Sequence, residues 1–394
     1  MRLVLVAVSS NSQLSGVTRH VANVARCLLL YSDMEAIHLI AAPWEHQLLR
    51  EAIAVEDPRL HIHCVHMDNF SPARNLWYYF DLPAIAAQLH ADVVHLAYPV
   101  PVNRRRLPCP TVVTVHDFYP WDIPENFGFP KVLFNRLILR QCLRAADGLA
   151  CVSDATMERM WKWQPEEVAQ RAVRIYNCVE PSRARVGRSP LPRTRQAPFL
   201  LCVAQHRRNK NIGLALKALS RMLREKTVHP ETLLAVVGIQ GPETGAIHRL
   251  IAGEGLGSNV VLLSGISEAE LQWCYRNCEA VLAPSLMEGF GLPVAEGLLT
   301  GCRVVCSDIP PFRELGGEHC HYFALGSNEE EEFAHAIGAA LKAPRSGPVV
   351  LPQLAGKVIA GEYMELYQRM VEAASSSSRL RPANEDLKPV AGAR

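Results

Sequence analysis

The chain has 394 residues, of which 49% are hydrophobic and 20% are charged, and its formal net charge is +2. Such a chain can form two domains with ordinary hydrophobic cores. The small net charge excludes a strongly basic nucleic-acid-binding protein, so we expect no nucleic-acid partner.

Short apolar runs alternate with longer amphipathic stretches in the first half of the chain. The pattern predicts helices at residues 17–30 and 45–55, and strands at residues 3–8, 37–41, 92–96, 111–115, 149–152 and 173–176. We interpret the first run as a buried strand rather than a signal peptide, because it is short and lacks a clear cleavage pattern. The alternation is typical of a doubly wound parallel sheet and predicts an N-terminal Rossmann-like domain at residues 1–184.

An arginine- and proline-rich stretch interrupts this rhythm, and we predict an interdomain linker at residues 185–197. The rhythm then restarts, which predicts a second Rossmann-like domain at residues 198–360. Its predicted helix is at residues 212–224, and its predicted strands are at residues 199–203, 233–237, 260–263, 280–283 and 304–306. A final helix is predicted at residues 361–374 and a flexible tail at residues 375–394.

The most informative segment of the second domain runs from residue 285 to residue 296. Two carboxylates, Glu288 and Glu296, flank a glycine-bracketed turn, and Pro293 begins a short helix that Gly301 ends. A helix N-terminus favours an anion, and ionised carboxylates accept hydrogen bonds from hydroxyl groups. A sugar, a diphosphate and a ribose in a row satisfy all of these features. The plainer alternative is a strand-to-helix turn with solvated glutamates.

The sequence of this loop, EGFGLPVAE, resembles the signature of the retaining glycosyltransferases of family 4. The resemblance covers nearly the whole chain and also includes residues 260–265, 271–275, 301–307 and 313–317. It implies the GT-B fold, in which two Rossmann-like doubly wound domains face each other across a cleft and the last helix returns to the first domain. We expect this return here too, although the region before the helix is short and an oligomer contact is the alternative.

The resemblance also implies an activity and roles for the residues of the loop. It implies transfer of a hexose from a nucleotide diphosphate sugar to a glycan or lipid-linked acceptor hydroxyl, with retained anomeric configuration. Glu288 holds the sugar and Glu296 holds the ribose diol in this interpretation. The remaining predicted donor-binding residues of the loop are Gly289, Phe290, Gly291 and Leu292.

A basic loop, residues 204–211, follows the first strand of the second domain. In a parallel sheet this position lies at the cleft edge, where ligands bind. We predict that Arg207 and Lys210 stabilise the departing diphosphate, as the resemblance implies, and we choose Arg207 over Arg208. A solvated basic turn is the alternative.

His116 follows a predicted strand of the first domain, and Gly16 follows the loop after the first strand. A lone histidine at a strand end is usually a capping or core residue, but the resemblance implies contact with the donor sugar. We therefore assign His116 to sugar positioning rather than to general base catalysis. Gly16 would let the backbone approach the donor closely. The family usually has two glycines here, whereas this chain has Ser15 before Gly16.

Arg136, Arg140 and Arg144 recur at a spacing of four, and residues 104–106 are all arginine. On a helix this spacing places the side chains on one face, which could contact anionic lipid headgroups or could simply be solvated. The twelve cysteines lack the paired spacing of a zinc site. We therefore expect a cytoplasmic protein with reduced cysteines, and the lipid alternative would place it at the inner face of the membrane.

The prediction is thus a metal-independent hexosyltransferase with no cofactor, because the cleft loops carry no acid-rich cluster. Its donor would be of the GDP-mannose or UDP-glucose type, and the sequence leaves this choice open. Two alternatives remain: a nucleotide-sugar epimerase on a similar scaffold, and a non-catalytic sensor of sugar nucleotides.

Overall fold

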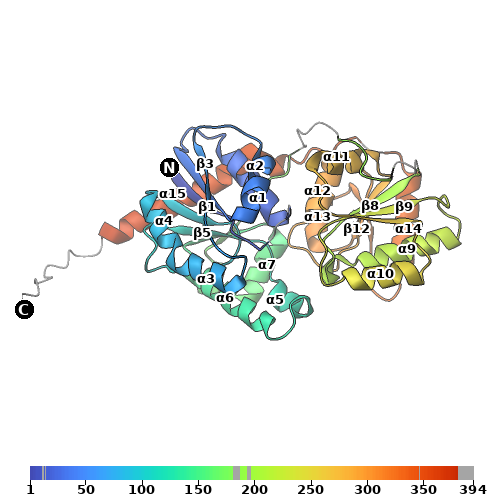
Figure 1. Ribbon diagram of the computed structural model, residues 1–394, viewed down its shortest axis with the longest axis horizontal. Helices are drawn as coiled ribbons and strands as arrows, with labels where there is room; N and C mark the ends of the chain where they lie inside the picture. The colour runs from blue at the N-terminus through green and yellow to red at the C-terminus, as the bar shows by residue number, and fades with distance from the viewer. Residues whose placement is uncertain (11–12, 14, 181–186, 193–196, 346, 380–394) are drawn as a thin grey trace, which may run out of the picture.

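The computed structural model of the protein describes all residues except 11–12, 14, 181–186, 193–196, 346 and 380–394. The described residues form two α/β domains that lie side by side, as Figure 1 shows. Each domain is built on one parallel sheet with helices on both faces. The expectation of two Rossmann-like domains is therefore confirmed.

The first sheet has seven strands, and every pair of neighbours in it is parallel. The strand order changes direction between β1 and β4, which creates a crevice at their carboxyl ends. In spatial order the strands are β3 (Leu60–Cys64), β2 (Ala36–Ala41), β1 (Arg2–Val6), β4 (Val93–Leu96), β5 (Thr111–Val115), β6 (Gly148–Cys151) and β7 (Ala172–Arg174). The helices are α1 (Gly16–Leu28), α2 (Pro43–Ile53), α3 (Ser71–Phe80), α4 (Leu82–Gln88), α5 (Tyr119–Asp122), η1 (Pro124–Asn126), α6 (Lys131–Ala145), α7 (Asp154–Trp163) and α8 (Glu166–Ala169).

The second sheet has six strands and repeats this plan, with a direction change between β8 and β11. In spatial order the strands are β10 (Val260–Leu263), β9 (Leu233–Val237), β8 (Phe199–Val203), β11 (Ala280–Ala283), β12 (Val304–Ser307) and β13 (Cys320–Phe323). The helices are η2 (Arg208–Lys210), α9 (Ile212–Arg224), α10 (Thr244–Gly253), α11 (Glu268–Asn277), α12 (Leu292–Leu299), α13 (Pro310–Gly316), α14 (Glu329–Lys342) and η3 (Pro352–Leu354).

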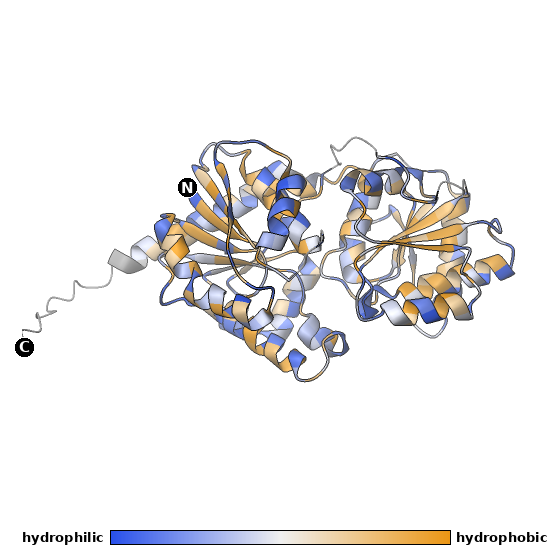
Figure 2. Ribbon diagram, viewed as in Figure 1, coloured by the Kyte–Doolittle hydropathy of each residue, from blue (hydrophilic) through white to orange (hydrophobic). Residues whose placement is uncertain are grey.

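The central strands of both sheets were predictable because they are buried on both faces and are therefore continuously apolar. Figure 2 shows this as hydrophobic colouring concentrated on the strands. The edge strands β3 and β13 were not predicted. Both are only partly buried, and β3 alternates histidine with apolar residues, so neither contains a long apolar run. Edge strands need less hydrophobic sequence, because one side of the strand has no neighbour.

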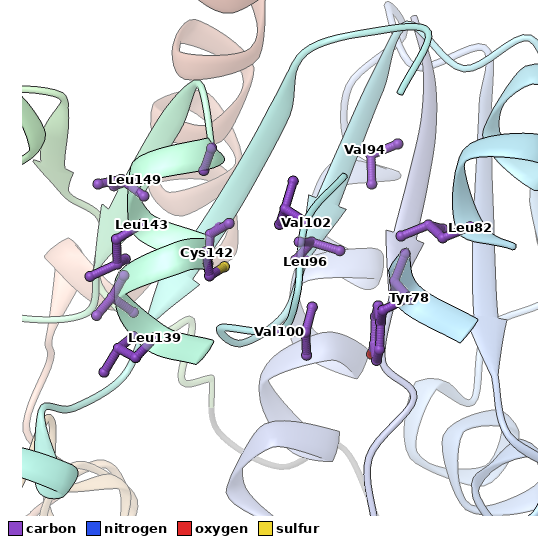
Figure 3. Packing of buried hydrophobic residues seen from close by; sticks show 14 of the residues in the cluster. Tyr78, Leu82, Val94, Leu96, Val100, Val102, Leu139, Cys142, Leu143 and Leu149 are labelled. Atoms are coloured by element: carbon purple, nitrogen blue, oxygen red, sulfur yellow. The ribbon is translucent and has the colours of Figure 1, made fainter. Parts of the chain in front are cut away.

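The helices pack on the sheets through their apolar faces. Figure 3 shows one such cluster in the first domain, where the inner face of α6 packs near strand β4 together with side chains from α3 and α4. Leu139, Cys142 and Leu143 supply the α6 side of this cluster. The N-terminal half of α6 contributes no buried residue, which bears on its outer surface below.

The last helix, α15 (Gly356–Arg379), returns to the first domain, as the resemblance implied (Figure 1). Tyr363, Leu366 and Tyr367 are buried there, in one cluster with α1 and β1. The predicted bounds, 361–374, were too narrow at both ends. The helix continues into the serine run, where the hydroxyls of Ser375 and Ser376 donate hydrogen bonds back to carbonyl oxygens four residues earlier.

Two predicted segments fall partly outside the described residues. Of the predicted linker 185–197, residues 185–186 and 193–196 are outside, whereas Leu191 is buried against the second domain. Of the predicted tail 375–394, the first residues belong to α15 and residues 380–394 are outside.

Candidate active site

A cavity of about 610 Å³ lies between the two domains. Its size is typical of a site for a small molecule. Its walls come from loops at the carboxyl ends of β1 and β5 in the first domain and of β8 and β11 in the second. The structure brings every predicted site residue to this cavity: Gly16, His116, Arg207, Lys210, Glu288, Gly289, Phe290, Gly291, Leu292 and Glu296.

The two glycines of the loop between β11 and α12 are required by close contacts within the protein. A Cβ atom on Gly289 would lie 1.7 Å from the carbonyl oxygen of His116, in the opposite domain. Gly291 has a φ of +110°, and a Cβ atom there would lie 2.7 Å from the ring of Phe312. The loop can therefore reach across the cleft and turn into α12 only with glycine at both positions.

The helix α12 begins one residue earlier than the sequence suggested, at Leu292, so that Pro293 occupies its second position. It ends at Leu299, and Gly301 adopts a φ of +75° just beyond. The side chain of Phe290 is buried and lies 6.1 Å, between ring centroids, from Tyr176 of the first domain. Its ring therefore packs between the domains.

Glu288 and Lys210 form an ion pair in the cavity wall. The Lys210 Nζ lies 2.6 Å and 2.8 Å from the two carboxylate oxygens of Glu288. The Ser285 hydroxyl donates to one of these oxygens at 2.7 Å, and the Tyr119 hydroxyl approaches the other at 3.4 Å. The glutamate is only 8% exposed, so the lysine supplies most of the charge compensation that a buried carboxylate requires.

Glu296 belongs to the second domain but is bound by both domains. Its Oε2 accepts a hydrogen bond of 2.6 Å from the buried hydroxyl of Tyr275. Its Oε1 accepts one of 2.9 Å from Arg19, which belongs to α1 of the first domain. Neither partner was predicted from the sequence, because no local spacing connects them with Glu296.

The basic loop after β8 places its two arginines differently. Arg207 lines the cavity, whereas Arg208 is absent from the lining among the residues that the structure describes. The loop forms the short η2 helix, in which the buried side chain of Asn209 contacts Tyr119 across the cleft. The choice of Arg207 for the diphosphate stays a prediction, and this geometry is consistent with it.

His116 is held by the backbone of the neighbouring strand segment. Its Nε2 donates to the carbonyl oxygen of Ala97 at 2.8 Å, which leaves Nδ1 as the acceptor of the ring. Burial lowers the pKa of His116 to about 4, so the ring is neutral at physiological pH. A neutral ring with one acceptor nitrogen suits hydrogen bonding to a sugar hydroxyl.

A buried polar network extends from His116 to the returning helix. The ring of His20 packs edge-on against His116, with 4.8 Å between centroids. His20 and His95 both hydrogen-bond to the hydroxyl of Thr114, and His95 also bonds the hydroxyl of Tyr367 in α15. One ring contact and a chain of hydrogen bonds thus connect His116 with the returning helix.

Asp117 was overlooked as a site residue, although it directly follows His116. It lines the cavity near Arg207, Glu288 and Lys210, and burial raises its pKa to about 6. Its position directly after a parallel strand could have identified Asp117 from the sequence.

Gly16 is not sterically required, because a Cβ atom there would meet only Leu292 at an ordinary 3.8 Å.

Within the described residues, no group of three histidine, cysteine, aspartate or glutamate side chains is arranged to hold a metal ion. None of the helices that the structure describes is long and apolar enough to cross a bilayer. The cavity is lined by three positively charged side chains, those of Arg19, Arg207 and Lys210.

Curated proteins similar to this chain include bacterial mannosyltransferases. The O-antigen chain mannosyltransferase RfbU of Salmonella typhimurium is 26% identical over 57% of this chain and 59% of its own length. The serotype-specific mannosyltransferase WbdA of Escherichia coli is 27% identical over 53% of this chain and 27% of its own. The chain therefore spans about three fifths or less of the length of these relatives.

Among solved structures, HepE of Anabaena in complex with UDP and glucose has a similar fold. Its TM-score is 0.64 at 16% identity, over 95% of this chain and all of HepE. Two family models together match most of the chain. Residues 14–183 match Glycosyltransferase Family 4, and residues 188–349 match Glycosyl transferases group 1. The chain belongs to this family of GT-B glycosyltransferases.

Proposed function

We propose that this protein transfers a mannosyl group from a nucleotide diphosphate mannose to a hydroxyl group of a glycan or lipid-linked acceptor, with retained anomeric configuration. The observation that carries the proposal is the convergence of Glu288, Glu296, Arg207 and Lys210 on one cavity at the N-terminus of α12. The names of the similar curated proteins favour mannose as the sugar.

In the proposed complex the diphosphate lies over the first turn of α12, where backbone N–H groups have no partner within the helix. Arg207 and Lys210 face it from the β8 loop and compensate its charge. Glu296 accepts hydrogen bonds from the ribose diol, while Glu288 and His116 hold the hydroxyl groups of the sugar.

Chemistry then depends on stabilising the leaving group. The bond between the anomeric carbon and the diphosphate oxygen breaks, and its electron pair leaves with the diphosphate. The acceptor oxygen bonds to the anomeric carbon on the same face, and its proton passes to a phosphate oxygen. Arg207 and Lys210 stabilise the added negative charge in the position where a divalent cation acts in other enzymes. We therefore propose that EDTA leaves the rate unchanged.

The test is an assay of nucleoside diphosphate release from GDP-mannose and UDP-glucose, with and without a lipid-linked oligosaccharide acceptor. NMR spectroscopy of the product determines its anomeric configuration. The proposal predicts release that depends on the acceptor, with GDP-mannose as the better donor. Conversion of the donor sugar without acceptor would indicate an epimerase, and binding without any release would indicate a sensor.

The two glutamates are distinguished by calorimetry with GDP or UDP alone. Glu296→Gln should weaken binding of the nucleoside diphosphate, because an amide is a poorer bidentate acceptor for the ribose diol. Glu288→Gln should leave this binding nearly unchanged while lowering turnover, because its proposed partner is the sugar. Equal losses of nucleotide affinity in both variants would contradict the assignment.

We also propose that the outer surface of α6 contacts anionic lipid. Phe134 and Leu137 of this helix are 64% and 63% exposed, and Phe129 just before it is 83% exposed, which is unusual for apolar side chains of this size. Leu137 shares one helix face with Arg140 and Arg144, both of which are exposed. Exposed apolar groups beside basic groups are the chemistry of a helix that lies in a bilayer interface.

The third arginine of the predicted stripe has another role, since Arg136 donates to the carbonyl oxygen of Pro120 at 2.8 Å.

The membrane test is sedimentation of the protein with vesicles of phosphatidylglycerol and phosphatidylcholine, compared with vesicles of phosphatidylcholine alone. The intact protein should bind the anionic vesicles, and the Phe134→Ser/Leu137→Ser variant should not. Equal recovery of both proteins with the anionic vesicles would contradict the proposed contact.

A further inference from the structure

Arg19 joins the two domains at the carboxylate that the proposed function assigns to the ribose. It lies on the first turn of α1, three residues after Gly16. Its Nη1 donates to Glu296 at 2.9 Å, and its Nη2 donates to Glu268 of α11 at 2.7 Å. A single guanidinium from the first domain therefore holds two carboxylates of the second. The Arg19 side chain is 21% exposed and that of Glu296 is 13% exposed, so this contact is largely shielded from water.

The charged and titratable groups that face Glu296 come from two elements, α1 and α11. Arg19 and the Tyr275 hydroxyl stabilise its ionised form, while the neighbouring Glu268 carboxylate disfavours it. Burial acts in the same direction as Glu268 and is the largest effect, so the pKa of Glu296 is raised overall. Arg19 is thus the only full positive charge among the groups named here that opposes protonation.

We infer that Arg19 is a positioning residue for donor binding, which keeps the Glu296 carboxylate ionised and oriented toward the ribose. The inference rests on the proposed function, in which Glu296 accepts hydrogen bonds from the ribose diol. A protonated glutamate has an O–H donor in place of one acceptor site and cannot accept from both ribose hydroxyls as well. The donor site is therefore complete only when the first domain presents Arg19 to the second.

The geometry also explains why the residue is arginine. The planar guanidinium sends two separate N–H groups to two carboxylates, whereas a lysine ammonium is a single point on a flexible stem. Arg19→Lys should consequently restore only part of the nucleotide affinity that Arg19→Gln loses.

The test is calorimetric titration of the full-length protein with GDP and with UDP between pH 5.5 and 8.5. At each pH we take the ratio of the nucleotide dissociation constant of Arg19→Gln to that of the wild type. Protonation of the free nucleotide affects both constants equally, so it cancels in this ratio. We expect this ratio to lie above unity at pH 6 and to fall as the pH rises, because a higher pH favours the ionised form of Glu296 without the help of Arg19. Arg26→Gln, which changes another arginine of α1 paired with Asn23, is the matched control and should give a ratio near unity throughout.

Three outcomes would overturn the inference or its basis, and they are distinguishable. A ratio for Arg19→Gln that is large at every pH would mean that Arg19 only holds the domains together. A ratio near unity at every pH would mean that Arg19 has no part in donor binding. Wild-type nucleotide affinity in Glu296→Gln would instead remove the ribose assignment itself, whatever Arg19→Gln shows.

Discussion

Replacing Lys210 by methionine separates leaving-group stabilisation from simple support of the buried glutamate. The substitution keeps the apolar stem and removes a charge that lies 2.6 Å and 2.8 Å from the carboxylate oxygens of Glu288. Losing one cation from the leaving group should cost about 2–4 kcal/mol of transition-state stabilisation, which is roughly a 30- to 1000-fold loss of turnover. Nucleoside diphosphate release at saturating donor measures this loss.

The same substitution also has a structural cost. It leaves the 8% exposed Glu288 with the hydroxyls of Ser285 and Tyr119 as neutral partners. Breaking a fully buried ion pair costs several kcal/mol, and because Lys210 itself is 20% exposed we expect about 2 kcal/mol here. Urea unfolding measures this change in the free energy of unfolding.

The double variant Lys210→Met/Glu288→Gln distinguishes the two effects. It removes the unpaired carboxylate, so it should recover most of the lost stability, while its turnover should lie well below that of Glu288→Gln alone. Arg208→Met, which removes a neighbouring cation outside the cavity lining, is the control and should retain near-wild-type turnover. If Lys210→Met lowered turnover no further in the Glu288→Gln background than Glu288→Gln does alone, Lys210 would act only as the partner of Glu288, and its proposed catalytic role would be refuted.

Further predictions concern a contact between the two domains and the packing of the returning helix on the first domain. Gly289→Ala should lower turnover about 100-fold with little change in melting temperature, because its Cβ atom would displace the backbone at His116 on the opposite side of the cleft. Tyr367→Phe should lower the free energy of unfolding by about 1–3 kcal/mol, because it leaves the buried Nδ1 of His95 without a partner; a urea-measured change below about 0.5 kcal/mol would contradict this. Burial lowers the pKa of His95 to about 3, so the unfolded chain binds its proton first and stability falls as pH drops below about 6.5. His95→Gln should lack this contribution, so the stability difference between wild type and variant should shrink by roughly 1 kcal/mol from pH 6.5 to pH 5.5. A difference that stays constant over this range would show that His95 binds its proton equally in the folded and unfolded states, so that burial does not lower its pKa.

Comparing the variant with the wild type is necessary in the last experiment because other groups titrate in the opposite direction. Burial raises the pKa of Asp117 to about 6 and that of Glu45 to about 7. Each of these carboxyls takes up its proton in the folded state before the unfolded chain does, so falling pH stabilises the fold through them. The absolute stability can therefore change little while the histidine contribution changes.

The sequence by itself determined the family, the two-domain plan and the position of most central strands. These features are local. A strand buried on both faces must be a continuous apolar run, and proline and glycine mark the ends of α12 through their own backbone preferences. The loop with Glu288 and Glu296 could be identified because all of its parts are consecutive in the chain. Where burial was partial, as in β3 and β13, the same local reasoning failed.

Only the tertiary structure decided which distant charges pair at the site. Arg19 and Glu296 are 277 positions apart, and Lys210 and Glu288 are 78 apart, so no local spacing could connect them. The parallel sheet of the second domain brings the loops of Lys210 and Glu288 to one edge, and the closeness of the two domains brings Arg19 to Glu296. The requirement for glycine at 289 has the same origin, since it is imposed by the backbone of the opposite domain rather than by the turn that contains it.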